Sequence, residues 1–140
     1  AIVRVEAPKL KAWANFLPEH FNMPDVKEIV TRGLYGLIEL LRMRAQELNI
    51  EVEYALANPL VASKEKAQIL LDAYDFCLRL RVAAQTFLDK EEDLVIYDWR
   101  ILDSVARLMH FHDRNELLRE FSNHGKKVYE IAVKLFPQYF

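Results

Sequence analysis

The sequence of 140 residues contains one cysteine, three glycines and no long apolar run. Cys77 stands alone, which excludes an internal disulfide and a thiolate metal cluster within one chain. The apolar run at 34–41 is interrupted by Gly36 and Glu39 and is much shorter than the roughly 18 residues of a membrane span. No signal peptide is visible. These absences predict a soluble, cytoplasmic protein without a membrane partner.

An excess of charge of one sign is also lacking. The chain has 19 basic and 21 acidic residues, interspersed, for a net charge of -2. Such a balance gives no field that would attract nucleic acid or anionic lipid, so neither partner is expected. With 52% hydrophobic side chains and no low-complexity linker, residues 1–140 are expected to bury one core as a single domain. The missing initiator methionine before Ala1 favours a piece of a larger protein.

The hydrophobic residues are arranged with helical periodicity. Pro8 can occupy the first turn of a helix running toward His20. Its predicted buried face holds Leu10, Trp13, Ala14 and Leu17. A long helix is predicted over 24–48, with a stripe of Val26, Val30, Gly33, Leu37, Leu41 and Leu48. Gly33 and Gly36 in that helix indicate either a kink or a close backbone contact.

The strongest helix signal follows Ser63, which can cap the helix. Its apolar residues are spaced alternately by four and three: Ile69, Ala73, Phe76, Leu80, Ala83 and Phe87. Before it, residues 49–60 alternate like a short strand, but we expect a loop.

Two further helices complete the pattern. Asp98 can cap a helix that ends near Phe111 and buries Ile101, Leu102, Val105 and Met109. Asp113 and Glu116 form a capping-box pattern that opens the last helix. Its seam is Leu118, Phe121, Gly125, Val128, Ala132 and Leu135. The predicted fold is all-α: an up-and-down bundle of about five helices, three of them long.

Candidate metal chemistry is weak. Adjacent His112 and Asp113 suggest a metal-dependent phosphohydrolase, with His20 and His110 upstream. However, no aspartate follows Asp113 to supply a distal ligand, so this class is only an outside alternative and no metal ligand is assigned. Asp113 is expected to cap the last helix, with both neighbouring histidines partly exposed.

Other constellations are equally incomplete. Glu51 and Glu53 would share one face of a strand and could hold magnesium, but no glycine-rich phosphate loop lies nearby. A solvated charged loop is the favoured interpretation. Cys77 is expected to pack as a buried, protonated thiol. No catalytic residue and no cofactor are therefore expected.

Arg79 and Arg81 are the candidate contact residues. Two positions apart on a helix, they point in different directions, so one of them can lie near a helix interface. Pairing with an acidic side chain of a neighbouring helix is favoured over contact with a phosphate or a partner. The aromatic residues Tyr97, Trp99 and 136–140 could either dock a partner or cover the end of the bundle.

Two stretches resemble a known family. Residues 70–85, LLDAYDFCLRLRVAAQ, are followed by an acidic turn at 92–94 and by Tyr97-Asp98-Trp99-Arg100. This order is similar to the helical domain of bacterial nitrogen-regulatory nucleotidyltransferases, the PII uridylyltransferases and glutamine synthetase adenylyltransferases. Upstream, residues 32–40 are similar to the family's Gly-Gly-Ile/Leu-Arg-Asp/Glu segment. Tyr35 replaces its arginine and Gly36 its acid.

The resemblance covers about 31–136 and implies a non-catalytic role. The family's catalytic half, with its Gly-Ser turn and metal-binding aspartates, has no counterpart in this sequence. We therefore expect a regulatory or scaffold domain that supports an adjacent nucleotidyltransferase core and docks protein partners. A stand-alone interaction or dimerisation bundle is the alternative, and a homo-oligomer is compatible with both interpretations.

Overall fold

The computed structural model describes residues 5–20, 25–47, 64–87 and 99–140. Its α-helices are α1 (Ala7–Ala14), α2 (Val26–Glu28), α3 (Tyr35–Glu47), α4 (Lys64–Phe87), α5 (Trp99–Leu108) and α6 (Arg114–Leu135). Between α2 and α3 lies the π-helical segment η2 (Ile29–Leu34), and two 3-10 turns are η1 (Pro18–His20) and η4 (Pro137–Tyr139). No strand occurs in these ranges. The all-α bundle is confirmed.

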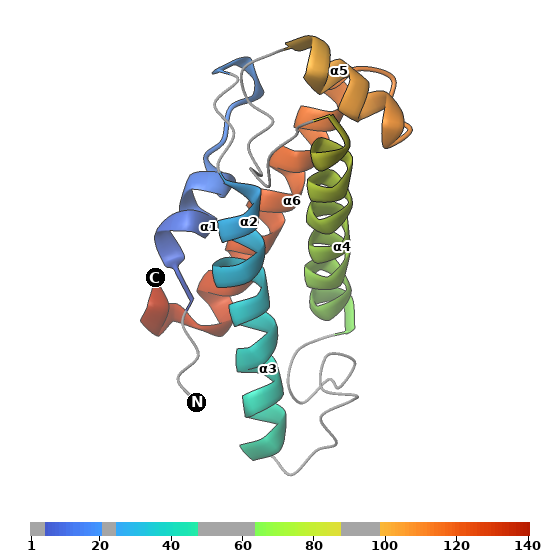
Figure 1. Ribbon diagram of the computed structural model, residues 1–140. Helices are drawn as coiled ribbons and strands as arrows, with labels where there is room; N and C mark the ends of the chain where they lie inside the picture. The colour runs from blue at the N-terminus through green and yellow to red at the C-terminus, as the bar shows by residue number, and fades with distance from the viewer. Residues whose placement is uncertain (1–4, 21–24, 48–63, 88–98) are drawn as a thin grey trace.

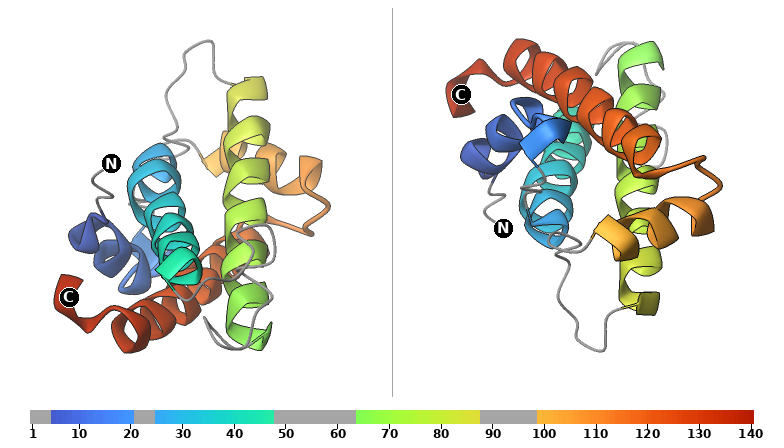
Figure 2. Two further views of the ribbon diagram at one scale, coloured as in Figure 1. Left: turned by 90° about the horizontal axis from the view of Figure 1, so that it is seen from below. Right: turned by 90° about the horizontal axis from the view of Figure 1, so that it is seen from above.

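The helices surround one apolar core. Figure 1 shows α3 and α4 running in opposite directions, with α6 passing behind them and α5 across one end. The views in Figure 2 show that α6 crosses α4 obliquely. Helix α6 contacts α1, α4 and α5, so three separate parts of the chain meet on it. It is the central helix of the bundle.

Helix α1 is shorter than predicted. Leu10, Trp13 and Ala14 are buried as expected, but the helix ends at Ala14, and the backbone N–H of Asn15 caps it on the Lys11 carbonyl. The chain then turns before Pro18, so Phe16 enters the core and Leu17 is 52% exposed. The prediction for Leu17 was wrong because helical periodicity no longer applies beyond Ala14.

The second predicted helix is continuous over 26–47 but changes type at η2. An alanine methyl group at Gly33 would lie 2.7 Å from Leu10 Cδ2, so the two helices approach closely there. The close contact at Gly33 is with the side chain of Leu10, and the helix is also locally distorted there into the π-helical segment η2.

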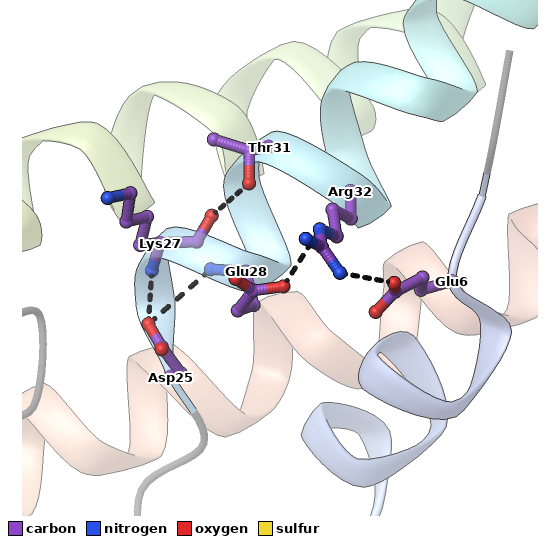
Figure 3. Close-up of polar contacts among 6 residues, drawn as sticks. All are labelled: Glu6, Asp25, Lys27, Glu28, Thr31 and Arg32. Carbon is purple, nitrogen blue, oxygen red and sulfur yellow. Dashed lines mark hydrogen bonds and ion pairs between the residues drawn. The ribbon is translucent and has the colours of Figure 1, made fainter.

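Polar contacts tie this helix to the amino-terminal segment (Figure 3). Asp25 Oδ1 accepts hydrogen bonds from the N–H groups of Lys27 and Glu28 at 2.9 and 3.4 Å, which caps α2. Arg32 forms ion pairs with Glu28 of its own helix and with Glu6. The Glu6 N–H also donates to the Arg32 carbonyl at 3.0 Å. The segment that carries α1 is thereby fixed against η2.

Helix α4 confirms the heptad-like pattern. Ala73, Phe76, Leu80 and Ala83 are buried, and Ile69 is partly buried against the core. Phe87 is an exception: it is the last residue of α4 and is exposed.

Helix α5 ends three residues earlier than predicted, at Leu108. His110 adopts a left-handed conformation with φ of 66°. The Phe111 N–H donates to the Ala106 carbonyl at 2.8 Å and the His110 N–H to the Arg107 carbonyl at 3.0 Å. This pattern is a Schellman motif, which ordinarily has glycine at the left-handed position.

Replacing His110 by glycine should therefore stabilise the fold. Glycine relieves the steric cost of the left-handed conformation, about 1 kcal/mol, although its more flexible unfolded chain offsets part of that gain. We expect the free energy of unfolding to rise by up to about 1 kcal/mol in urea titrations followed by circular dichroism. A decrease would mean that the His110 side chain makes contacts that outweigh the backbone cost.

Helix α6 begins as predicted. Asp113 Oδ1 accepts a hydrogen bond from the Glu116 N–H at 3.0 Å. The Glu116 carboxylate in turn accepts a hydrogen bond from the backbone N–H of His112. In a usual capping box the donor is the N-cap residue itself, which here is Asp113. Five of the six predicted seam residues are buried, and Leu135 packs partly buried against the core. Phe136 is buried at the carboxy-terminal end, whereas Tyr139 and Phe140 are exposed.

The Asp113 cap makes stability depend on pH. The hydrogen bond from the Glu116 backbone is the main cause that lowers the pKa of Asp113 below its ordinary value of 3.8. The cap therefore stabilises the folded chain above that value and is lost as the pH falls through the lowered pKa. Asp113→Ala should lower the thermal midpoint of unfolding at pH 7. This deficit relative to the unsubstituted chain should shrink toward pH 2. A deficit independent of pH would contradict the cap.

Several predicted features lie outside the described residues: the loop at 49–60 with Glu51 and Glu53, the caps Ser63 and Asp98, and also Leu48 and Tyr97. In the described ranges, no helix has the length and apolar character needed to cross a membrane.

Candidate partner-docking surface

An open groove lies between the second half of α4 and the carboxy-terminal end of α5. Its volume is about 560 Å³. Leu78, Val82, Ala83, Leu108 and Met109 supply an apolar lining, and Arg79, Thr86 and His110 supply polar groups. Val82 is 65% exposed and Leu108 is 49% exposed. Large apolar side chains that are exposed to solvent on two adjoining helices are typical of protein-interaction surfaces.

The groove has a fixed shape because rigid elements build it. Val82 and Arg79 lie on the 24-residue helix α4, which packs on α6 and α5. Leu108 ends α5, and the Schellman motif then turns the chain so that His110 lines the groove. The left-handed His110 is a strained backbone position at the rim of this hollow, and such strain is often found at functional sites.

A polar hollow adjoins the groove, between α4 and α6. It is lined by Asp72, Asp75, Phe76, Arg79, Phe111, Glu120 and His124. Of the described residues, three carboxylates and one guanidinium line it, so this lining is acidic when His124 is neutral. The two hollows share Arg79, which forms the ridge between them.

His124 forms one wall of the polar hollow. Its ring lies against Phe76, with ring centroids 4.7 Å apart, and its Nε2 is 3.2 Å from Glu120 Oε1. Burial is the main cause that lowers the pKa of His124 from its ordinary value of 6.5, and Glu120 opposes that shift. His124 is therefore mainly neutral at pH 7, which leaves the hollow with a net negative charge.

The predicted contact residues have different positions. Arg79 lines both hollows and forms an ion pair with Asp75, with 3.0 Å between Nε and Oδ2. Pairing was predicted with a neighbouring helix, but Asp75 belongs to α4 itself. Arg81 is partly buried and lines neither hollow. Ligand or partner contact by either arginine stays a prediction.

The groove residues Val82 and Leu108 were missed in the sequence. Both are apolar residues outside the predicted buried stripes of their helices, and that position is the signal that could have identified them. Helical periodicity assigns core residues well, but it does not show which exposed apolar residues a neighbouring element brings together.

Two other candidate residues, Cys77 and Asp113, have structural roles in this fold. Cys77 is buried, and burial raises the pKa of its thiol far above the ordinary range. Asp113 caps α6, and His110 and His112 are exposed. Across the residues that the structure describes, no three His, Cys, Asp or Glu side chains are grouped so that they could hold a metal ion.

Trp99 lies at the start of α5 and is exposed. The guanidinium carbons of Arg100 and Arg114 lie 5.7 and 5.4 Å from its ring centroid. Arg114 also pairs with Asp103 of α5 at 3.1 Å. These contacts link the start of α6 to α5, while Trp99 itself is 54% exposed, so docking a partner and covering the end of the bundle both stay predictions for it.

The fold defines an all-α domain with an open groove between α4 and α5. The family model described as GlnD PII-uridylyltransferase matches residues 26–136. The chain therefore belongs to the GlnD PII-uridylyltransferase family, a family of nitrogen-regulatory nucleotidyltransferases, and the predicted resemblance over 31–136 is confirmed. No curated protein and no solved structure matches the chain.

Proposed function

We propose that this chain is a non-catalytic regulatory domain that supports a nucleotidyltransferase core and docks a protein partner in the groove between α4 and α5. Family membership over 26–136 supports the link to nucleotidyltransferase chemistry. The open groove with exposed Val82 and Leu108 is the single observation that carries the docking role. A cytoplasmic location goes with this proposal, since Cys77 is a free, buried thiol.

Several exposed large apolar residues lie outside this groove: Leu17, Tyr35, Met43, Leu71, Phe87, Trp99, Tyr139 and Phe140. Val82 and Leu108, by contrast, come from two different helices that meet at one hollow. A partner side chain placed there would lose water on several sides at once, and such desolvated positions supply most of the binding energy of protein interfaces.

The family name supplies the partner to test, namely the PII protein of the organism that encodes this chain. In calorimetric titrations we expect saturable binding, and Val82→Glu should weaken it about tenfold or more because a carboxylate would replace an apolar contact. Leu17→Glu is the matched control: it makes the same change at an exposed apolar residue elsewhere and should leave affinity unchanged. Circular dichroism should show both variants folded.

Two results would contradict the docking role. One is a lack of PII binding by the unsubstituted chain. The other is an equal loss of affinity in both variants. If the chain instead sediments as a dimer that Val82→Glu dissociates, the groove serves the alternative function, that of a stand-alone dimerisation bundle.

A further inference from the structure

The outward face of α4 joins the two hollows into one surface. Asp72, Asp75, Arg79, Val82 and Thr86 follow one another at spacings of three and four, so they form a single stripe along the helix. One end of this stripe is acidic and lies beside Glu120 and His124 of α6. The other end is apolar and lies beside Leu108 and Met109.

From this arrangement we infer that the surface binds an amphipathic helical segment of the partner, with an apolar side chain in the groove and a lysine or arginine in the acidic hollow. The inference rests on the proposed docking function and specifies the chemistry of the docked segment. Asp75 and Val82 are seven residues apart on α4, or about 10 Å along the axis. A partner helix lying along the stripe would carry its basic and apolar residues at the same spacing, i and i+7.

Charge complementarity supports this occupant. Among the residues that the structure describes, the acidic hollow presents Asp72, Asp75 and Glu120 beside one cation, Arg79. Asp72 Oδ1 accepts a hydrogen bond from Gln68 at 2.8 Å, and the Arg79–Asp75 pair is exposed. Exposed pairs on a helix surface are weak, so an incoming cation can share these carboxylates at little cost.

The charged groups that act on His124 are of both signs. They are Asp72 and Arg79 of α4, and Glu120 and Lys127 of α6. Lys127 is exposed and is not a lining residue, and among the described lining residues the carboxylates outnumber the cation Arg79. An acidic partner segment would meet the three carboxylates and be repelled.

Two synthetic helical peptides test the inference on the complete chain. The first carries leucine and lysine seven positions apart, and the second replaces that lysine by glutamate. Fluorescence polarisation should show that the lysine peptide binds roughly tenfold more tightly or better, with an affinity that falls as salt is added. Asp72→Asn with Glu120→Gln should abolish most of this preference, while Lys126→Gln, on another face of α6, should not change it. Equal binding of both peptides, preference for glutamate, or no binding at millimolar peptide would overturn the inference.

The same double variant separates this inference from the proposed function. If PII binding depends on Val82 but not on Asp72 and Glu120, the docking role holds and the basic segment is wrong. If the lysine peptide binds with the expected preference while PII does not bind, the inferred surface chemistry holds and the proposed docking of PII is wrong.

Discussion

Replacing Trp13 by alanine is expected to lower the free energy of unfolding by about 3–5 kcal/mol, a large share of the total stability of a domain of this size. Trp13 has no exposed surface. Its Nε1 donates a hydrogen bond to the Phe121 carbonyl at 2.8 Å, and its ring lies 5.4 Å from the Phe121 ring centroid. Truncation would leave a cavity where α1 meets the central helix α6.

Trp13→Phe is the control, because it keeps an aromatic ring but loses the indole donor. We expect it to cost clearly less than Trp13→Ala. Urea unfolding followed by far-ultraviolet circular dichroism measures the free energy of unfolding of both variants. This signal comes from the helical backbone and does not depend on the altered tryptophan. A cost below about 1 kcal/mol for Trp13→Ala would show that α1 is peripheral. The expected large cost would show that the folded unit extends before residue 26, where the family match begins.

Gly125→Ala has the second large expected effect. An added methyl group would lie 2.8 Å from the Trp13 carbonyl oxygen and 2.7 Å from Trp13 Cδ1. Alanine gains about 1 kcal/mol over glycine in a helix interior, but backbone atoms of α1 would have to move away. Because overpacking commonly costs about 1–3 kcal/mol or more, we expect a net loss of about 1–2 kcal/mol in the free energy of unfolding.

Gly33→Ala is the matched control for this substitution. The added methyl group would meet Leu10 Cδ2 at 2.7 Å, which is the end of a side chain that can rotate. The same urea titrations should therefore place Gly33→Ala within about 1 kcal/mol of the unsubstituted chain. If Gly33→Ala were the more damaging of the two, the tightest helix contact would lie between α1 and η2 rather than between α1 and α6.

Local sequence pattern was sufficient for most of the helices. The spacing of Ala73, Phe76 and Leu80 placed α4, and Asp113 marked the start of α6. These features depend on neighbours within one or two helical turns, which periodicity and capping describe directly. The predictions failed at Leu17, which lies beyond the end of α1, and at Phe87, which is the last residue of α4. At these positions helical periodicity no longer determines which residues are buried.

Contacts between distant elements could not be predicted in the same way. Gly125 was expected to admit a neighbouring helix, but its neighbour is α1, more than 100 residues earlier in the chain. The groove depends on where α5 ends against α4, and a Schellman motif with histidine at the left-handed position gives little sequence signal. Arg79 was selected from the sequence, whereas Val82 and Leu108 became visible only once α4 and α5 were packed together.

The central claim, that the groove between α4 and α5 docks the partner, is tested most directly by nuclear magnetic resonance of methyl groups in the chain, with and without PII. The claim predicts that the largest shifts on binding occur at the methyl groups of Val82 and Leu108, while those of Leu17 and Met43 stay unchanged. Shifts concentrated at Leu17 or Met43, or no shifts at saturating PII, would contradict it.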